Sequence, residues 1–131
     1  MARQKKVIDA SVIVKWYVQE QGTEASLELR EAHIRGDILL LAPDFVVIEV
    51  LNALRYKQVK PAFLVEAADD LYNIQIQLQH AATIIPLAVG LAQAHNLSFY
   101  DALYAALAEL HNCPLLTAGK KLATTPHGRL V

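Results

Sequence analysis

The sequence predicts a three-layer α/β domain in which helices cover both faces of a mostly parallel β-sheet. Segments typical of strands alternate with segments typical of helices along the chain, and this order favours parallel strands joined by helices. The run at residues 38–41 is unbroken in its apolar character, as expected of a strand covered on both faces. The length of 131 residues and the 54% of hydrophobic residues suit a single domain, residues 1–131, that needs no disulfide.

The first half of the chain contains two expected strands, each followed by helical sequence. The expected elements are a strand at 5–9, a helical turn at 10–17, a helix at 23–35, a strand at 38–41 and a helix from 43 to about 58. Pro43 and Asp44 place the start of the last helix, because proline suits a first helical turn and an acid favours the positive end of the helix dipole.

The second half continues the alternation and adds three expected strands. The expected elements are a helix at 61–72, a strand at 74–79, a helix from 86 that Asn96 ends, a helix that Ser98 opens and Asn112 ends, a strand at 114–117, a helical turn at 118–124 and a short strand at 129–131. The segment 74–79 alternates strictly between apolar and polar residues, so it should be a strand with one polar face at an edge of the sheet.

Composition limits the classes of function. The formal net charge of −1 excludes a globally basic nucleic-acid binder but allows a local basic patch. Basic residues gather near both ends of the chain, and no acidic residue follows Glu109. A fold that joins the two ends would therefore create a positive surface; the alternative is that these charges are scattered over the solvated surface.

Cellular location and redox chemistry follow from the absence of particular segments. Neither an export signal nor an apolar run long enough to span a membrane is present, so we expect a cytoplasmic protein without a membrane partner. The only cysteine, Cys113, stands in an apolar stretch and is expected to be a buried structural thiol.

Three acidic residues stand at positions where carboxylates can serve a site. Asp9 ends the first expected strand, Glu49 interrupts an apolar helix, and Asp101 lies in the first turn of another helix. Each has a structural alternative: Asp9 could cap the following turn, Glu49 could face a narrow solvent stripe with Asn52, and Asp101 could complete a capping box with Ser98. Parallel sheets place their sites at the carboxyl ends of strands, which favours a shared site.

The residue types indicate which metal such a site would bind. Three carboxylates without a supporting cluster of histidines or cysteines favour a hard cation with oxygen ligands, so Mg²⁺ or Mn²⁺ is expected rather than Zn²⁺. The adjacent acids Asp69 and Asp70 lie on one expected helix and are interpreted as part of a solvated face.

Four segments together resemble the PIN domain family, in its VapC toxin type. They are Val7-Ile8-Asp9-Ala10-Ser11-Val12, Pro43-Asp44 leading to Glu49-Val50-Leu51-Asn52-Ala53-Leu54, Ser98-Phe99-Tyr100-Asp101-Ala102-Leu103-Tyr104, and Leu115-Leu116-Thr117-Ala118. Each segment alone is weak evidence, but the four in this order and spacing are a specific signal that covers nearly the whole chain.

The resemblance implies more than the residues alone. It implies a five-stranded parallel sheet with helices on both faces, an endoribonuclease that uses Mg²⁺ or Mn²⁺ and leaves 5′-phosphate and 3′-hydroxyl ends, a homodimer, and an antitoxin partner that inhibits the enzyme. The metal ligands of the family correspond to Asp9, Glu49 and Asp101. Ser11 corresponds to a hydroxyl beside the first acid, and Thr117 to a hydroxyl near the metal pocket.

The sequence departs from the family pattern at Gly119. The family commonly has an aspartate at this place, where this chain reads Thr117-Ala118-Gly119. One negative charge is therefore missing from the expected pocket. This departure supports an alternative in which the chain is weakened in catalysis and acts by binding RNA or an antitoxin. An unrelated receiver- or flavodoxin-type domain fits less well, because only Asp9 stands at the first strand where a receiver needs an acidic pair.

The expected substrate contacts come from basic and aromatic side chains near these segments. Lys120 and Lys121 follow the pocket and Lys15 lies on the opposite flank, so all three are candidates for contacts with an RNA backbone. Trp16 and Tyr100 could stack on bases, although a place in the core is the more frequent role of such residues. Apolar surface on the helices at 23–35 and 61–72 could serve a dimer or an antitoxin.

Overall fold

A computed structural model describes residues 3–131, in which five strands form one parallel sheet with the order β3-β2-β1-β4-β5. The strands are β1 (Gln4–Ile8), β2 (Ile38–Pro43), β3 (Gln77–Gln79), β4 (Leu115–Thr117) and β5 (Gly128–Leu130). The predicted fold class and the five-stranded sheet are thus confirmed. Met1 and Ala2, part of the expected domain, lie outside the described residues.

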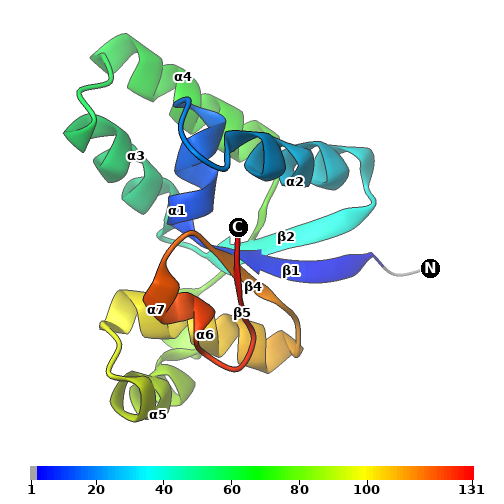
Figure 1. The fold of residues 1–131 in the computed structure, drawn as a ribbon, viewed down its shortest axis with the longest axis vertical. Helices are drawn as coiled ribbons and strands as arrows, with labels where there is room; N and C mark the ends of the chain where they lie inside the picture. The colour runs from blue at the N-terminus through cyan, green and yellow to red at the C-terminus, as the bar shows by residue number, and fades with distance from the viewer. Residues whose placement is uncertain (1–2) are drawn as a thin grey trace.

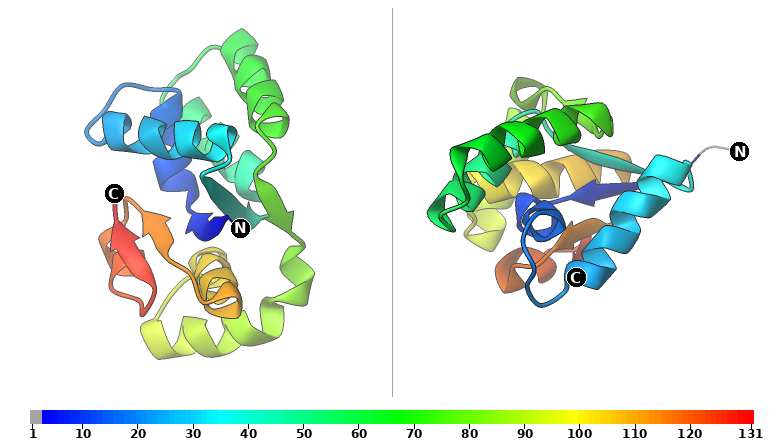
Figure 2. Two further views of the ribbon diagram at one scale, coloured as in Figure 1. Left: turned by 90° about the vertical axis from the view of Figure 1, so that its right-hand side faces the viewer. Right: turned by 90° about the horizontal axis from the view of Figure 1, so that it is seen from above.

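Helices form a layer on each side of this sheet (Figures 1 and 2). They are α1 (Ala10–Ile13), η1 (Val14–Trp16), α2 (Thr23–Arg35), α3 (Val46–Tyr56), α4 (Pro61–Asn73), η2 (Ala81–Thr83), α5 (Ile85–His95), α6 (Phe99–His111) and α7 (Lys120–Ala123). Helices α1 to α4 lie on one side, and α5 and α6 lie on the other. Within residues 3–131, no helix combines the length and the apolar character that crossing a membrane requires.

The core lies where the two central strands meet the helix α6. Val7 and Ile8 of β1 and Leu40 and Leu41 of β2 are fully buried, as both faces of a parallel sheet between helices should be. Helix α6 is buried continuously over residues 102–108, so it is the central helix of its layer. The start of α6 is therefore held rigidly against the carboxyl ends of the strands, which is where the sheet presents its site.

Two sequence-based boundaries were wrong, and both errors involve β3. Pro43 ends β2 rather than opening a helix, because it pairs with Gln79 of β3 and helix α3 begins only at Val46. The expected strand at 74–79 is reduced to its last three residues, because Ile74 still caps α4 and Gln75 adopts a left-handed turn with φ of 57°. The position of β3 at an edge of the sheet is confirmed.

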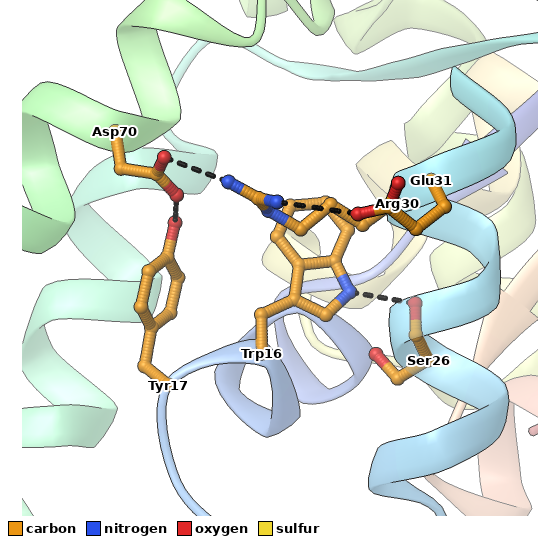
Figure 3. A network of polar contacts seen from close by, with 6 residues as sticks. All are labelled: Trp16, Tyr17, Ser26, Arg30, Glu31 and Asp70. Atoms are coloured by element: carbon orange, nitrogen blue, oxygen red, sulfur yellow. Dashed lines mark hydrogen bonds and ion pairs between the residues drawn. The ribbon is translucent and has the colours of Figure 1, made fainter. Parts of the chain in front are cut away.

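A network of polar contacts fastens α2 and α4 to the segment after α1 (Figure 3). The Asp70 carboxylate accepts hydrogen bonds from the Tyr17 hydroxyl at 2.6 Å and from the Arg30 guanidinium at 2.7 Å. Arg30 also lies over the Trp16 ring, 6.0 Å from its centroid, and the indole N–H of Trp16 donates to the Ser26 carbonyl. Asp70 is therefore a bonded structural residue, which the interpretation of a solvated acidic face did not anticipate.

Buried His33 connects α2 to two further segments. Its Nδ1 accepts the backbone N–H of Leu40 at 3.1 Å, so the ring proton is on Nε2, which donates to the carbonyl of Ile74 at 2.8 Å. One side chain thus ties α2 to the central strand β2 and to the turn after α4. Because both ring nitrogens are used within the protein, His33 has a structural role.

Candidate active site

The predicted acidic residues approach one another at the carboxyl edge of the sheet. Asp9 directly follows β1, Glu49 lies in the first turn of α3, and Asp101 lies in the first turn of α6. Thr117 ends β4, the neighbour of β1. In an open parallel sheet this edge is where strand ends and helix starts present polar side chains together.

The Asp9 carboxylate is fixed by two hydroxyl groups, one from α1 and one from the end of β4. Its Oδ2 accepts the Ser11 hydroxyl at 2.7 Å and the Thr117 hydroxyl at 2.8 Å. Among residues 3–131, no side chain or backbone group donates to its other oxygen, Oδ1. Asp9 precedes α1 but makes no side-chain cap for it. The alternative role as a helix cap is therefore not what its carboxylate does, and Oδ1 remains the oxygen that can serve a ligand.

The same two hydroxyls also bind the backbone of the loop after β4. Ser11 Oγ accepts the backbone N–H of Ala118 at 3.0 Å, and Thr117 Oγ1 accepts that of Gly119 at 3.0 Å. Each hydroxyl thus donates its one proton to Asp9 and accepts a hydrogen bond from the 118–119 backbone. Ser11 and Thr117 are positioning residues for Asp9, in the places that the resemblance implied.

Glu49 is held by a buried tyrosine on another helix. The Tyr104 hydroxyl donates to Glu49 Oε1 at 2.7 Å, and the Tyr104 ring packs edge-on against Phe45, with centroids 5.7 Å apart. Glu49 is half-buried, so it does not lie on a fully solvated stripe, whereas Asn52 is exposed. The contact between α3 and α6 therefore orients one Glu49 oxygen and leaves the other for a ligand.

Asp101 has a less constrained carboxylate. The Ser98 hydroxyl accepts the Asp101 backbone N–H at 3.2 Å, which caps α6 as predicted. The reciprocal half of a capping box, from the Asp101 side chain to the Ser98 backbone, is not formed among the described residues. The half-buried Asp101 side chain is thus placed by the start of its helix alone.

The three carboxylates interact electrostatically. Burial first, and then the Asp9 and Asp101 charges, raise the pKa of Glu49, and the hydrogen bond from Tyr104 opposes this rise. Burial and the Asp9 charge raise the pKa of Asp101, and the Lys121 ammonium opposes that rise. Like charges held this close favour a bound cation, because a cation relieves their mutual repulsion.

The residues present fit a hydrated divalent cation better than a closed metal cage. Among residues 3–131, no three His, Cys, Asp or Glu side chains are grouped so that they could together hold a metal ion. Mg²⁺ usually keeps several of its waters and needs only one or two direct carboxylate ligands. The free oxygen of Asp9, the second oxygen of Glu49 and the unbonded carboxylate of Asp101 suit that kind of binding.

Two glycines that flank α7 differ in the space around them. A Cβ at Gly119 would meet only Thr117 Oγ1, at an ordinary contact distance of 3.5 Å, and the φ of −90° suits any residue. A Cβ at Gly128 would lie 2.2 Å from the Leu122 carbonyl oxygen, so α7 can approach β5 only because residue 128 is glycine. The backbone at Gly119 therefore accepts a Cβ without a clash, so the departure from aspartate is not imposed by the backbone or by its nearest neighbours.

The expected RNA-contacting residues fall in different environments. Lys120 and Lys121 are exposed at the start of α7, and Lys121 is close enough to affect Asp101 electrostatically. Lys15 is half-buried and its ammonium donates to the Gln21 carbonyl. Trp16 packs against the core as described above, and Tyr100 is 61% exposed while its ring edge meets Phe45.

Tyr104 is the functional residue that sequence reasoning did not single out. It lies three residues after Asp101, on the same face of α6. That spacing was the available signal, because a polar group beside a candidate ligand on one helix face can reach the same site. Its pairing with Glu49 depends on where α3 and α6 begin on opposite sides of the sheet, which spacing does not determine.

Comparison with known proteins identifies the family of the chain. The sequence model of the PIN domain family matches residues 6–128. The chain therefore belongs to the PIN domain family, as the resemblance predicted. Among its relatives, Ribonuclease VapC3 of Pyrobaculum aerophilum is 31% identical over 126 residues, which cover 91% of this chain and 92% of that protein. Ribonuclease VapC1 of Mycobacterium tuberculosis is 38% identical over 90 residues, 65% of this chain and 66% of that protein.

A solved structure supports the fold independently. The crystal structure of PAE2754 from Pyrobaculum aerophilum matches with a TM-score of 0.73, over 99% of this chain and 84% of that one. The sequence identity is 20%, so this likeness concerns the arrangement of strands and helices alone.

Proposed function

We propose that the chain is a metal-dependent endoribonuclease, the toxin of a type II toxin–antitoxin pair, acting as a single cytoplasmic domain on RNA phosphodiesters. The observation that carries the proposal is the shared site of Asp9, Glu49 and Asp101, in which Asp9 is fixed by two hydroxyls and all three charges interact. The VapC ribonucleases to which the chain is similar support the same substrate class.

The side chains of the site have two different roles, as metal ligands and as groups that orient those ligands. Asp9 Oδ1, the second oxygen of Glu49 and the Asp101 carboxylate would hold Mg²⁺ or Mn²⁺, partly through waters, while Ser11, Thr117 and Tyr104 keep the ligands oriented. The bound cation supplies charge neutralisation at the scissile phosphate and makes an attacking water more acidic.

Lys120 and Lys121 would contact the RNA backbone beside the scissile bond, which contributes affinity but no sequence choice. Lys15 keeps one donor on Gln21, and its remaining ammonium protons would serve the opposite flank.

Exposed apolar side chains on α3 and α4 support a protein partner. Ile48, Tyr56, Val65 and Tyr72 are each more than 60% exposed, and clustered exposed apolar residues mark interaction surfaces. We propose that a cognate antitoxin and a second copy of the chain bind through such surfaces, to which α2 adds Ile34.

Gly119 favours a second candidate function. The fourth acid is absent, although a Cβ at this position would meet no steric obstacle. A chain weakened in cleavage would act by binding RNA or its antitoxin through the same surfaces.

An RNA cleavage assay separates the two candidates. Purified wild type, Asp101→Asn and Gly119→Asp are incubated with structured and unstructured RNA in Mg²⁺, Mn²⁺ or EDTA. The proposal expects cutting by the wild type that needs a divalent cation and that Asp101→Asn lowers by about 10²-fold or more. Equal cutting by wild type and Asp101→Asn would sink the proposed site, and cutting by Gly119→Asp alone would establish the weakened form.

A further inference from the structure

A second charged feature lies at the opposite edge of the sheet. A pocket of about 460 Å³ is lined by the start of β1, by the segment between α6 and β4, and by Arg129 of β5. In β1, Lys5 precedes Asp9 by four residues, which is about 13 Å at the rise of a strand. In α6, His111 follows Asp101 by about 15 Å of helix. The acidic site and this amino-edge pocket are thus the two ends of the same elements.

The amino-edge pocket is strongly and uniformly basic. Arg3, Lys5, Lys6 and Arg129 line it, and no aspartate or glutamate does. None of these four cations is in an ion pair with another residue of the described range 3–131. The chain as a whole carries a net charge of −1, so this gathering is a local concentration of positive potential.

Two effects oppose anion binding here, and both are small. The carboxyl end of α6 faces the pocket, but a helix end carries only about half a charge, and its last carbonyls already accept the N–H groups of Asn112 and Cys113. Burial and the neighbouring Lys5 lower the pKa of His111, so its ring adds no charge near neutral pH. Lys6 also borders a neighbouring pocket that Glu24, Glu28 and Glu31 of α2 line, so its charge is partly offset. The charges of Arg3, Lys5 and Arg129 outweigh these terms.

We propose that the amino-edge pocket binds the sugar-phosphate backbone of single-stranded RNA, beyond the nucleotides held at the carboxylates. This inference rests on the proposed ribonuclease function and names a further part of its substrate site. Helix α7, with Lys120 and Lys121, packs directly against β5, which carries Arg129. A strand of RNA leaving the acidic site can therefore follow cations along the β5 edge as far as Lys5.

The lining favours a nucleic-acid backbone over an acidic peptide. Protein interfaces centre on buried aromatic and other large anchors, and the pocket is lined by no aromatic ring other than His111. A phosphate backbone needs only cations at intervals, and its binding depends strongly on salt. The cations of the pocket therefore suit an RNA sugar-phosphate backbone.

The test measures RNA binding in EDTA, where no cation-dependent cleavage interferes. Labelled single-stranded RNAs of about four and about sixteen nucleotides span the range of common site sizes. The double variant Lys5→Gln with Arg129→Gln should weaken binding of the longer RNA about tenfold and leave the shorter nearly unchanged. Its salt dependence, as the slope of log K against log salt, should fall by about 1.4, or 0.7 per lost phosphate contact.

Matched variants guard against trivial explanations. The double variant Arg55→Gln with Lys60→Gln removes the same charge from the α3–α4 hairpin and should not change binding of the longer RNA. Gln4→Lys adds a cation to the pocket and should tighten binding of the longer RNA. Misfolding would not produce such a gain. Circular dichroism checks that each variant folds.

The outcomes separate this inference from the proposed function. Equal losses in both double variants, equal losses for both RNA lengths, or displacement by polyglutamate of equal charge would each overturn the pocket as an RNA site. Cleavage in Mg²⁺ is assayed separately. Cutting of RNA without the length-dependent effect would support the ribonuclease function and overturn the RNA-binding pocket. The length-dependent effect without cutting would support the pocket and overturn the ribonuclease function.

Discussion

Asp9 and Asp101 serve one site but are held in opposite ways. Asp9 Oδ2 accepts two short hydrogen bonds, from the Ser11 hydroxyl of α1 and the Thr117 hydroxyl at the end of β4, and these hydroxyls also bind the loop after β4. Asp101 has only its place at the start of α6, and its charge is opposed by burial and by Asp9. One carboxylate thus belongs to the framework of the fold, while the other is maintained at some cost in stability. Substitution at either position should therefore reduce activity, but only substitution of Asp9 should also reduce stability.

The largest expected difference comes from removing each carboxylate. Asp9→Ala and Asp101→Ala should both reduce RNA cleavage by about 10²-fold or more. Only Asp9→Ala should also lower the free energy of unfolding, by about 1–3 kcal/mol, because it leaves the Ser11 and Thr117 hydroxyls without their acceptor. Urea unfolding followed by circular dichroism measures this, and equal stability of the two variants would remove the distinction.

Thr117→Val tests whether the hydroxyl framework, rather than the carboxylate charge, holds Asp9. The substitution keeps the shape of the fully buried side chain but removes its bonds to Asp9 and to the Gly119 N–H. We expect a loss of about 1–2 kcal/mol in unfolding free energy and a fall in kcat of about tenfold. Thr117→Ser should recover most of both, and a failure of this rescue would point to packing instead.

Tyr104→Phe tests the intermediate case, Glu49, which one hydrogen bond orients. The ring keeps its packing against Phe45, and the hydroxyl loses its bond to Glu49 Oε1 together with its backbone contact at Ala10. The expected fall in kcat is about three- to tenfold, which corresponds to about 1 kcal/mol. Steady-state cleavage kinetics over a range of Mg²⁺ concentrations measure it, and an unchanged Mg²⁺ dependence would mean that Tyr104 has no part in orienting Glu49.

The smallest expected effect is the stabilisation that a divalent cation produces without any substrate. At a Mg²⁺ concentration about ten times its Kd, binding adds about 1.4 kcal/mol to the folded state, which raises the Tm by a few degrees. Asp101→Ala should reduce this shift, since it removes one of the interacting charges. Thermal unfolding with and without Mg²⁺ provides the comparison, and Na⁺ at equal ionic strength serves as the control for screening.

The parts of the fold that sequence predicted are those determined locally. The apolar run of β2 and the capping residue Ser98 appear where their chemistry places them. The wrong start of α3 shows the limit: Pro43 is a good first helical residue, but its pairing with Gln79 of β3 keeps it in the sheet. Such pairing depends on a segment far along the chain, which local preference does not include.

The same limit applies to the candidate site. Asp9 and Asp101 stand at a strand end and a helix start, so the alternation of elements places both at the carboxyl edge of the sheet. The bond between Tyr104 and Glu49 joins side chains from helices on opposite sides of the sheet and was not foreseen. The positive surface expected from the joined chain ends does form, since Arg129 and Lys5 line one pocket, but its location opposite the carboxylates required the topology.

The two glycines beside α7 have different evolutionary consequences. Gly128 sits against the Leu122 carbonyl, so a library of single substitutions should retain only glycine at that position. Gly119 has room for a side chain and an ordinary backbone conformation. The missing acid can therefore be regained, or lost again, in a single substitution that needs no compensating change elsewhere. The charge of the candidate site can therefore change by one unit while the architecture around it stays the same.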